Sequence, residues 1–285
     1  MLKSNKDRLV IQSAQGKIHG PTSRSPYRVN REGIGEILPG VGGICYNVKV
    51  GDSCMTVVGD HVEPGVSIRN EIDVENNALM LLAGIGNEAK VMTGEAKGAK
   101  GYVTGMHGGI EHVLIHFERE DLDKLAIDDK ILVKCWGQGL AFEGYEDVKF
   151  MNIDPSLLEK LGLEESEGVL QLPVAAQVPA HLMGSGIGGP TAVSGDYDIM
   201  TGDPEANEAY GLDKLRFGDL VLLSDCDNTF GRQYLKGAVS IGVVVHSDCI
   251  LSGHGPGIAV IASCKTDRLK GVLKEESNIA KHLPF

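Results

Sequence analysis

The sequence predicts a mainly β protein of the α+β class, with antiparallel β barrels or a sandwich, a few short helices and two lobes. Short apolar runs rich in β-branched residues alternate with Gly, Asp and Asn, as strands alternate with turns. The 38 glycines among 285 residues are about twice the usual share of ~7 per cent and are scattered rather than periodic. Aromatic residues make up only 5 per cent, so the core must be aliphatic.

One local pattern, an Asp-containing turn that leads into an apolar run, occurs three times. The turns and the strands they predict are 50–52 before 53–60, 127–129 before 130–137, and 217–219 before 220–225. Turns of this kind are typical of barrels and sandwiches, and they favour a mostly antiparallel architecture.

Helices are predicted over four segments. Asp154 and Asp203 are N-cap residues, each followed by a proline for the first turn and, some residues later, by a glycine that can end the helix. The expected helices cover 155–161, 204–210, 74–83 and 268–280.

The acidic segment 163–168 marks the boundary between two predicted lobes. An N-terminal β-rich lobe covers about 1–150, and a C-terminal β-rich lobe covers about 151–285 and carries most of the candidate site. An aliphatic, glycine-rich surface commonly buries its strand edges by assembly, so we expect a homo-oligomer.

The charge and the cysteines restrict the class of protein. The formal net charge of −12 argues against nucleic acid or an anionic membrane as a partner. The six cysteines have no CxxC spacing and mostly lie in or beside apolar runs, as reduced, buried thiols do. The first residues lack the apolar segment of a signal peptide, and no apolar run reaches the length of a membrane span. We therefore expect a cytoplasmic protein.

Polar side chains gather at the ends of apolar runs in the C-terminal lobe. Each group has two such side chains two residues apart, and therefore on one face of a strand. The pairs are His246 with Asp248, Asp225 with Asp227, and Asp196 with Asp198. Neighbouring carboxylates stay ionised together only beside a cation; otherwise one of them takes up a proton. The alternative is that each pair caps its own turn.

If these strands are neighbours, their side chains form one metal site. The predicted ligands of a divalent cation are Asp196, Asp225, Asp227 and His246. Carboxylate-rich ligation suits Mg, Mn or Ca, and added histidines shift the preference toward Zn.

Glycine-rich segments supply candidate catalytic groups. His107 follows Gly105, and Glu111 stands at the entrance of the next strand on its apolar face, so we predict a His107–Glu111 acid–base pair. On this pattern His112 and His116 point the other way, toward solvent or a subunit contact. His254 lies in a Gly-His-Gly-Pro-Gly run whose glycines allow close backbone packing. The alternative is that these histidines only hydrogen-bond their own loops.

A further polar group, Asp60, His61 and Glu63, ends the apolar run before Pro64. The Pro-Gly pair favours a turn, which would expose these side chains to solvent. His61 is a functional candidate here, and an exposed turn residue is the alternative.

The glycines of residues 184–189 have GxGxxG spacing, but a proline and no helical pattern follow them, which argues against a dinucleotide site. Their backbone N–H groups could still bind an anion. We therefore predict that Gly186, Gly188 and Arg232 bind the substrate. Arg232 could equally neutralise the nearby carboxylates.

Four segments carry a resemblance over the whole chain: TGMHGGIEHVLIHF, GSGIGGPTAVSGDYDIM, RFGDLVLLSDCDNTFGRQY and VVVHSDCILSGHGPG. They resemble a prokaryotic family of uncharacterised proteins catalogued as a domain of unknown function. That family has no assigned activity, so the resemblance implies no catalytic residues.

About thirty residues, LQLPVAAQVPAHLMGSGIGGPTAVSGDYDI, are similar to a segment of the acetamidase/formamidase family of β-rich, metal-associated amide hydrolases. The chain departs from that pattern at Gly184–Gly186, which replace an acidic–His pair, and at Asp196–Asp198, which stand where Asp-Gly-Glu is found.

These observations favour a metal-assisted hydrolase of a small amide-like substrate. The cation would lower the pKa of a bound water, and His254 or His107 would move the proton. A non-catalytic protein that binds a small anionic metabolite beside Arg232 is the alternative, and a structural oligomer with cation-stabilised turns is a third.

Overall fold

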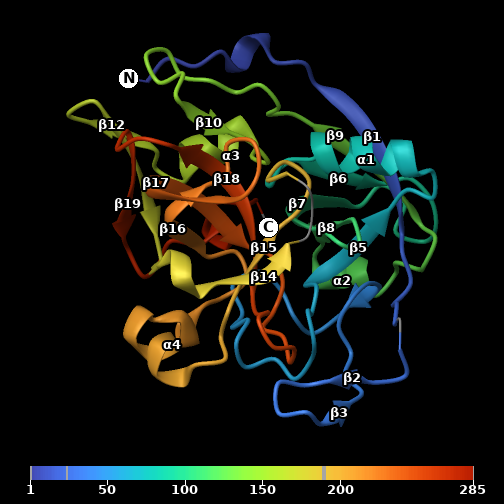
Figure 1. Ribbon diagram of the computed structural model, residues 1–285. Coiled ribbons are helices and arrows are strands. Elements are labelled where there is room, and N and C mark those ends of the chain that lie inside the picture. The colour runs from blue at the N-terminus through green and yellow to red at the C-terminus, as the bar shows by residue number, and fades with distance from the viewer. Residues whose placement is uncertain (1, 24, 188–190, 285) are drawn as a thin grey trace.

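The computed structural model describes residues 2–23, 25–187 and 191–284 and consists of two β-rich bodies side by side (Figure 1). Figure 1 shows a barrel on the right and a second sheet on the left, with β14 and β15 near the middle. The predicted fold class is confirmed, because most strands pair antiparallel and the described part of the chain contains four short α-helices.

The first body is a closed antiparallel barrel. Strand β1 pairs with β9 on one side and with β5 on the other, so the sheet returns to its first strand. The strands, in spatial order, are β1 (Gln12–Ile18), β9 (Lys130–Cys135), β6 (Glu88–Val91), β7 (Lys100–His107), β8 (His112–His116) and β5 (Gly65–Arg69), with β4 (Ile44–Cys45) added beside β5. Closure removes the free edges that an open sheet would expose.

The second body is a mixed sheet around two long hydrophobic strands. Its order is β13 (Ala176–Val178), β16 (Leu220–Asp227), β17 (Gln233–Val244), β18 (Gly257–Cys264), β15 (Tyr197–Ile199) and β14 (Met183–Ile187). Every residue of β18 is buried, because this strand of small and aliphatic residues is covered on both faces. Strand β10 (Val148–Phe150) also pairs with β18, so the predicted boundary at 150 falls at the end of a strand of this sheet.

The remaining elements are small. A three-stranded sheet contains β11 (Glu164–Ser166), β12 (Val169–Val174) and β19 (Leu269–Leu273), and a hairpin contains β2 (Arg28–Val29) and β3 (Gly35–Glu36). The helices are α1 (Asp73–Leu82), α2 (Arg119–Leu122), α3 (Pro155–Lys160) and α4 (Pro204–Tyr210), with 3-10 turns at Lys6–Arg8, Ala180–Leu182, Leu212–Lys214 and Ile279–Lys281. None of these helices has both the length and the apolar character needed to span a membrane.

Three of the four predicted helices are present. The carboxylates of Asp154 and Asp203 accept backbone N–H groups at the starts of α3 and α4, and Gly211 ends α4 in the left-handed region. The helix predicted over 268–280 is wrong, because β19 pairs there with β12. Gly271 allows β19 to lie close to β12, since a Cβ at that position would lie 2.8 Å from a side-chain carbon of Val174.

Of the three turn-to-strand predictions, two are correct and one is wrong. Strands β9 and β16 follow their turns, but residues 53–60 form a loop. This loop and the residues on either side of it pack against the second body: Cys54 of the loop, with Val48 before it and Val62 after it, belongs to the buried cluster of the second sheet. N-terminal residues therefore contribute to a core that consists mainly of C-terminal residues.

Candidate functional site

Four histidines and four carboxylates meet between the barrel and the second sheet. They are His61, His107, His246, His254, Asp60, Glu63, Asp196 and Asp198. All are buried except His254, whose side chain is 29% exposed and marks the solvent edge of the group. We call these eight residues the His/Asp cluster.

The start of β18 brings Asp196, Asp198 and His246 together. Strand β15 pairs with one edge of β18, and β17, which His246 follows, pairs with the other. Gly257, the first residue of β18, therefore lies between them. A Cβ on Gly257 would lie 2.1 Å from Asp196 Oδ2 and 2.2 Å from His246 Nε2, so only glycine leaves room for these ligand atoms.

The two nitrogens of His246 have different surroundings. Nδ1 donates to the backbone carbonyl of Ser247 at 2.9 Å, which directs Nε2 toward the carboxylates. Nε2 lies 2.8 Å from Asp196 Oδ2 and 3.4 Å from Asp198 Oδ1, yet it is buried and makes no hydrogen bond of acceptable geometry. Burial would lower the pKa of His246, but the two carboxylates outweigh it and raise the pKa well above its usual value. The position strongly favours a cation.

His107 is oriented by Glu63, a fully buried carboxylate. Glu63 Oε1 lies 2.5 Å from His107 Nδ1, and Oε2 accepts from Gly42 N at 2.7 Å. His112 Nδ1 lies 3.0 Å from the same carboxylate. Burial would raise the pKa of Glu63, but the two histidines hold it well below its usual range. Glu63 therefore stays ionised and fixes the tautomer of His107.

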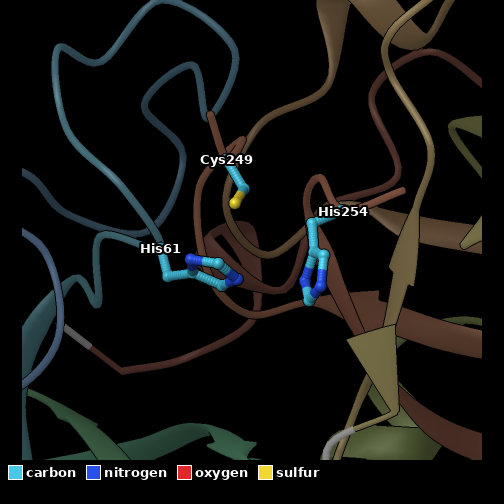
Figure 2. A group of neighbouring side chains, drawn as sticks. All are labelled: His61, Cys249 and His254. Carbon is cyan, nitrogen blue, oxygen red and sulfur yellow. The ribbon is translucent and has the colours of Figure 1, made fainter. Parts of the chain in front are cut away.

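His61 is oriented in the same way by Asp60, 3.0 Å from its Nδ1. Asp60 also accepts the thiol of Cys249 and pairs with Arg28, whose guanidinium lies 2.9 Å away. Figure 2 shows the Cys249 sulfur above His61 and His254, with the two rings facing a common space. His61 itself has a φ of 55°, in the left-handed region that few non-glycine residues occupy.

Asp198 is shared by three histidines. Its Oδ2 lies 2.7 Å from His254 Nδ1 and 3.7 Å from His61 Nε2, while its Oδ1 faces His246. Burial would raise the pKa of Asp198, but these histidines lower it well below its usual value. Asp198 therefore joins two halves of the cluster as a carboxylate.

The arrangement has the chemistry of a metal-binding site. Possible ligand atoms lie within 4.8 Å of one another in three overlapping groups: His107, Asp196 and His246; His61, Asp198 and His246; and His61, Cys249 and His254. In the first two groups, each histidine has its Nδ1 bound to a carboxylate or carbonyl oxygen, which leaves Nε2 for a metal. Such outer partners are typical of metal-ligating histidines.

Two predicted metal ligands, Asp225 and Asp227, do not join the cluster. Strands β16 and β17 are antiparallel, with Leu220 opposite Val243 and Asp227 opposite Gln233. The acids at the end of β16 therefore lie at the other end of the hairpin from His246: Asp227 is seven residues from Leu220, about 23 Å of extended strand, and His246 lies beyond the opposite residue Val243. The prediction assumed strand ends on a common edge, which antiparallel pairing does not provide.

Of the other predicted site residues, some lie in the His/Asp cluster and others have different partners. Asp196, His246, His107 and His254 meet in the cluster, but Glu111 does not pair with His107, which contacts Glu63 instead. The carboxylate of Asp248 accepts from Thr201 and Cys249 rather than orienting His246.

The predicted anion-binding group is also placed differently. The guanidinium of Arg232 donates to Gly184 O at 2.6 Å and lies over the Tyr197 ring, 5.3 Å from its centre. It thus ties β14 to β15. Gly186 lies in β14, and Gly188 lies outside the described residues.

The sequence analysis did not predict the burial of Asp60, His61, Glu63 and His112. The predicted turn at 64–65 was expected to expose the first three, and His112 was expected to face solvent or a subunit, but all four are buried. Val62 and Ser247 exchange backbone and side-chain hydrogen bonds, which hold this loop against the second sheet. The available signal was the spacing Asp-His-x-Glu at 60–63, three polar residues in four positions, which a solvent turn does not require.

Comparison with known proteins identifies the family. The sequence model described as domain of unknown function DUF4438, N-terminal, matches residues 27–159, and its C-terminal counterpart matches residues 160–283. The chain belongs to this family. The two matched ranges meet between 159 and 160, whereas we predicted the lobe boundary near 150.

A solved structure, described as the crystal structure of TM1086, has the same fold. It is 52% identical in sequence, the alignment covers 99% of each chain, and the TM-score is 0.95. No curated protein matches the chain. These comparisons do not show the resemblance to the acetamidase/formamidase family.

Proposed function

We propose that the His/Asp cluster binds a divalent cation through His107, Asp196 and His246. The observation that carries the proposal is the buried Nε2 of His246. Its partner nitrogen is bound to Ser247, and the Asp196 carboxylate is 2.8 Å away in a direction unsuited to a hydrogen bond. A cation between nitrogen and carboxylate satisfies both groups. The imidazole-rich set favours zinc over magnesium or calcium.

We propose further that the cation activates water for hydrolysis of a small amide. A bound cation lowers the pKa of its water toward neutrality. The water oxygen then forms a bond to the carbonyl carbon, the carbon–nitrogen bond breaks, and the proton passes to the leaving nitrogen. Asp198 Oδ1, 3.4 Å from His246 Nε2, is placed to move this proton. This replaces the role expected for His254 and His107, since His107 serves as a ligand.

The location of the cluster supports a small substrate. Its side chains are buried apart from His254, so access is restricted to the edge formed by the loop between β17 and β18. The partial burial also keeps the local dielectric low, which strengthens the effect of a cation on a bound carbonyl. The alternative of an anion binder is less favoured, because Arg232 is already engaged by Gly184 and Tyr197.

The test is elemental analysis of the purified full-length chain, combined with hydrolysis of a panel of short primary amides. We expect stoichiometric metal, and loss of both metal and activity in Asp196→Asn and after chelation. Asp225→Asn is the matched control, because its carboxylate accepts from Gly237 N at the far end of the hairpin. A metal-free wild type, or equal metal in both variants, would contradict the proposal.

A further inference from the structure

We propose that the cluster binds two divalent cations, the second through His61, His254 and the Oδ2 atom of Asp198. This inference rests on the proposed function, which requires only the first cation. It assigns the remaining histidines to a second position and makes Asp198 the carboxylate between the two.

The ligand atoms fall into two sets. On one side, the first set is His107, Asp196 and His246. On the other, His61 and His254 offer nitrogens within 4.8 Å of each other. One imidazole nitrogen has one lone pair, so His246 cannot serve both positions. The rings of His61 and His246 lie 5.0 Å apart between centres, which places the two positions side by side.

Asp198 spans the two positions with separate oxygens. Its Oδ2 lies 2.7 Å from His254 and 3.7 Å from His61, and its Oδ1 lies 3.4 Å from His246 of the first set. A carboxylate with one oxygen toward each position is the usual bridge of two-metal hydrolytic sites, whose ions lie about 3.5–4 Å apart. In the two-cation site Oδ1 is a ligand of the first cation rather than a proton acceptor, and the proton that passes to the leaving nitrogen is the one carried by the metal-bound hydroxide.

The second position has its own outer support. Asp60 binds His61 Nδ1 at 3.0 Å, which leaves Nε2 facing Asp198. The thiol of Cys249 donates a hydrogen bond to the carboxylate of Asp60, 3.0 Å away. We therefore assign Cys249 a positioning role on Asp60 rather than a place among the ligands.

Charge balance favours two cations over one. Asp60, Glu63, Asp196 and Asp198 are each at most 6% exposed, and the guanidinium of Arg28 pairs with Asp60. Histidines that bind a metal are neutral, so in the metal-bound state these groups carry three formal negative charges in a buried volume, which is costly without compensation. One divalent cation leaves a negative charge. Two cations and a bridging hydroxide leave none, and the hydroxide is the nucleophile that the proposed hydrolysis needs.

The experiment counts metal ions in the full-length chain after removal of metal and reloading with Mn²⁺ alone. We expect two Mn²⁺ per chain and an electron paramagnetic resonance spectrum of an exchange-coupled pair. His254→Ala should bind one ion and lose the coupling, because His254 is partly exposed and its removal spares the first set. His181→Ala, which removes an exposed histidine outside the cluster, is the control and should keep two.

The outcomes separate the two proposals. One ion in the wild type, without coupling, would overturn the second position and leave the proposed function in place. No bound ion would overturn both. Two uncoupled ions, or two ions in His254→Ala, would place the second ion elsewhere and reject this inference. The coupling measurement needs no variant, so it holds even if a substitution disturbs folding.

Discussion

The two ends of the β16–β17 hairpin carry the same kind of sequence and behave differently. Asp225 and Asp227 close β16, and His246 follows β17, each after an apolar strand. At one end, donors of the same hairpin satisfy the acids. At the other, Asp196 has one backbone donor, and its second oxygen and the carboxylate of Asp198 face His246. Whether an acid at a strand end belongs to a metal site therefore depends on the groups that it contacts.

The partners explain the contrast. Asp227 accepts from Thr229 N, Thr229 Oγ1 and Gln233 Nε2 at 2.6–3.0 Å, and Asp225, at a bulge with a φ of 55°, accepts from Gly237 N. These bonds are local, and the ammonium of Lys265, 3.6 Å from Asp227 Oδ2, supplies a positive charge from the protein itself, so no metal ion is needed. Asp196 has one backbone donor, Gly108 N at 2.8 Å, and its second oxygen faces His246.

Substitution of Gly257 by Ala is the strongest way to break this contrast. The new Cβ would overlap Asp196 Oδ2 and His246 Nε2, so we expect loss of metal binding at the His/Asp cluster. Gly20→Ala is the control, because the nearest atom to a Cβ there is 4.0 Å away. Elemental analysis and circular dichroism of both variants provide the measurement. Unchanged metal in a folded Gly257→Ala would disprove the geometry proposed for the site.

Removal of a group that orients a metal-binding histidine should have a smaller effect on metal binding. Glu63→Gln keeps the shape of the side chain but loses the charge that orients His107, and we expect metal affinity to fall about 10- to 100-fold. Competition with a metal indicator measures the change. Glu111→Gln serves as the matched control and should retain wild-type affinity. Equal affinities in the two variants would remove Glu63 from the support of the site.

The distal acids provide the smallest expected effect, on stability alone. Burial would raise the pKa of Asp227, but hydrogen bonds from Thr229 and Gln233 outweigh it and lower the pKa below its usual value. The ionised group therefore stabilises the fold above the unfolded-state pKa of about 4, and this contribution disappears as pH falls through the lower native value. We expect Asp227→Asn to lose about 1–2 kcal/mol of unfolding free energy at pH 7.

Urea unfolding of wild type and Asp227→Asn between pH 7 and pH 3 measures this difference. The gap between the two proteins should narrow toward acid, and metal content should be equal. A gap that persists unchanged at pH 3 would show that the contribution does not depend on ionisation. Reduced metal content in Asp227→Asn would instead show that Asp227 supports metal binding, which its position in the hairpin does not predict.

Local signals predicted the fold class and several elements well. The capping residues Asp154 and Asp203 predicted the starts of α3 and α4, and the Asp-containing turns before apolar runs predicted β9 and β16. Local signals failed at β19, where pairing with β12 outweighs helix-like sequence, and at residues 53–60, where apolar residues pack as a loop. In both cases the partner lies far away in the chain, beyond the reach of a local pattern.

For the candidate site, the sequence analysis named Asp196, His246, His107 and His254, which the structure brings together, because their residue types and spacing are visible locally. The same reasoning could not separate them from Asp225 and Asp227, since the side of a sheet on which a strand ends depends on strand order and direction. Nor could it predict the burial of Glu63, which depends on the contact between Val62 and Ser247.

By itself, the sequence determined a glycine-rich, aliphatic β protein with metal-ligating residue types near strand ends. Only the tertiary structure decided which of these residues meet. Alternation and capping act over a few residues and are encoded locally, whereas convergence requires that β15 and β17 flank the same strand, β18. That arrangement is selected by burial across the whole chain, and it places His246 beside Asp196 while it leaves Asp227 at the opposite end of its hairpin.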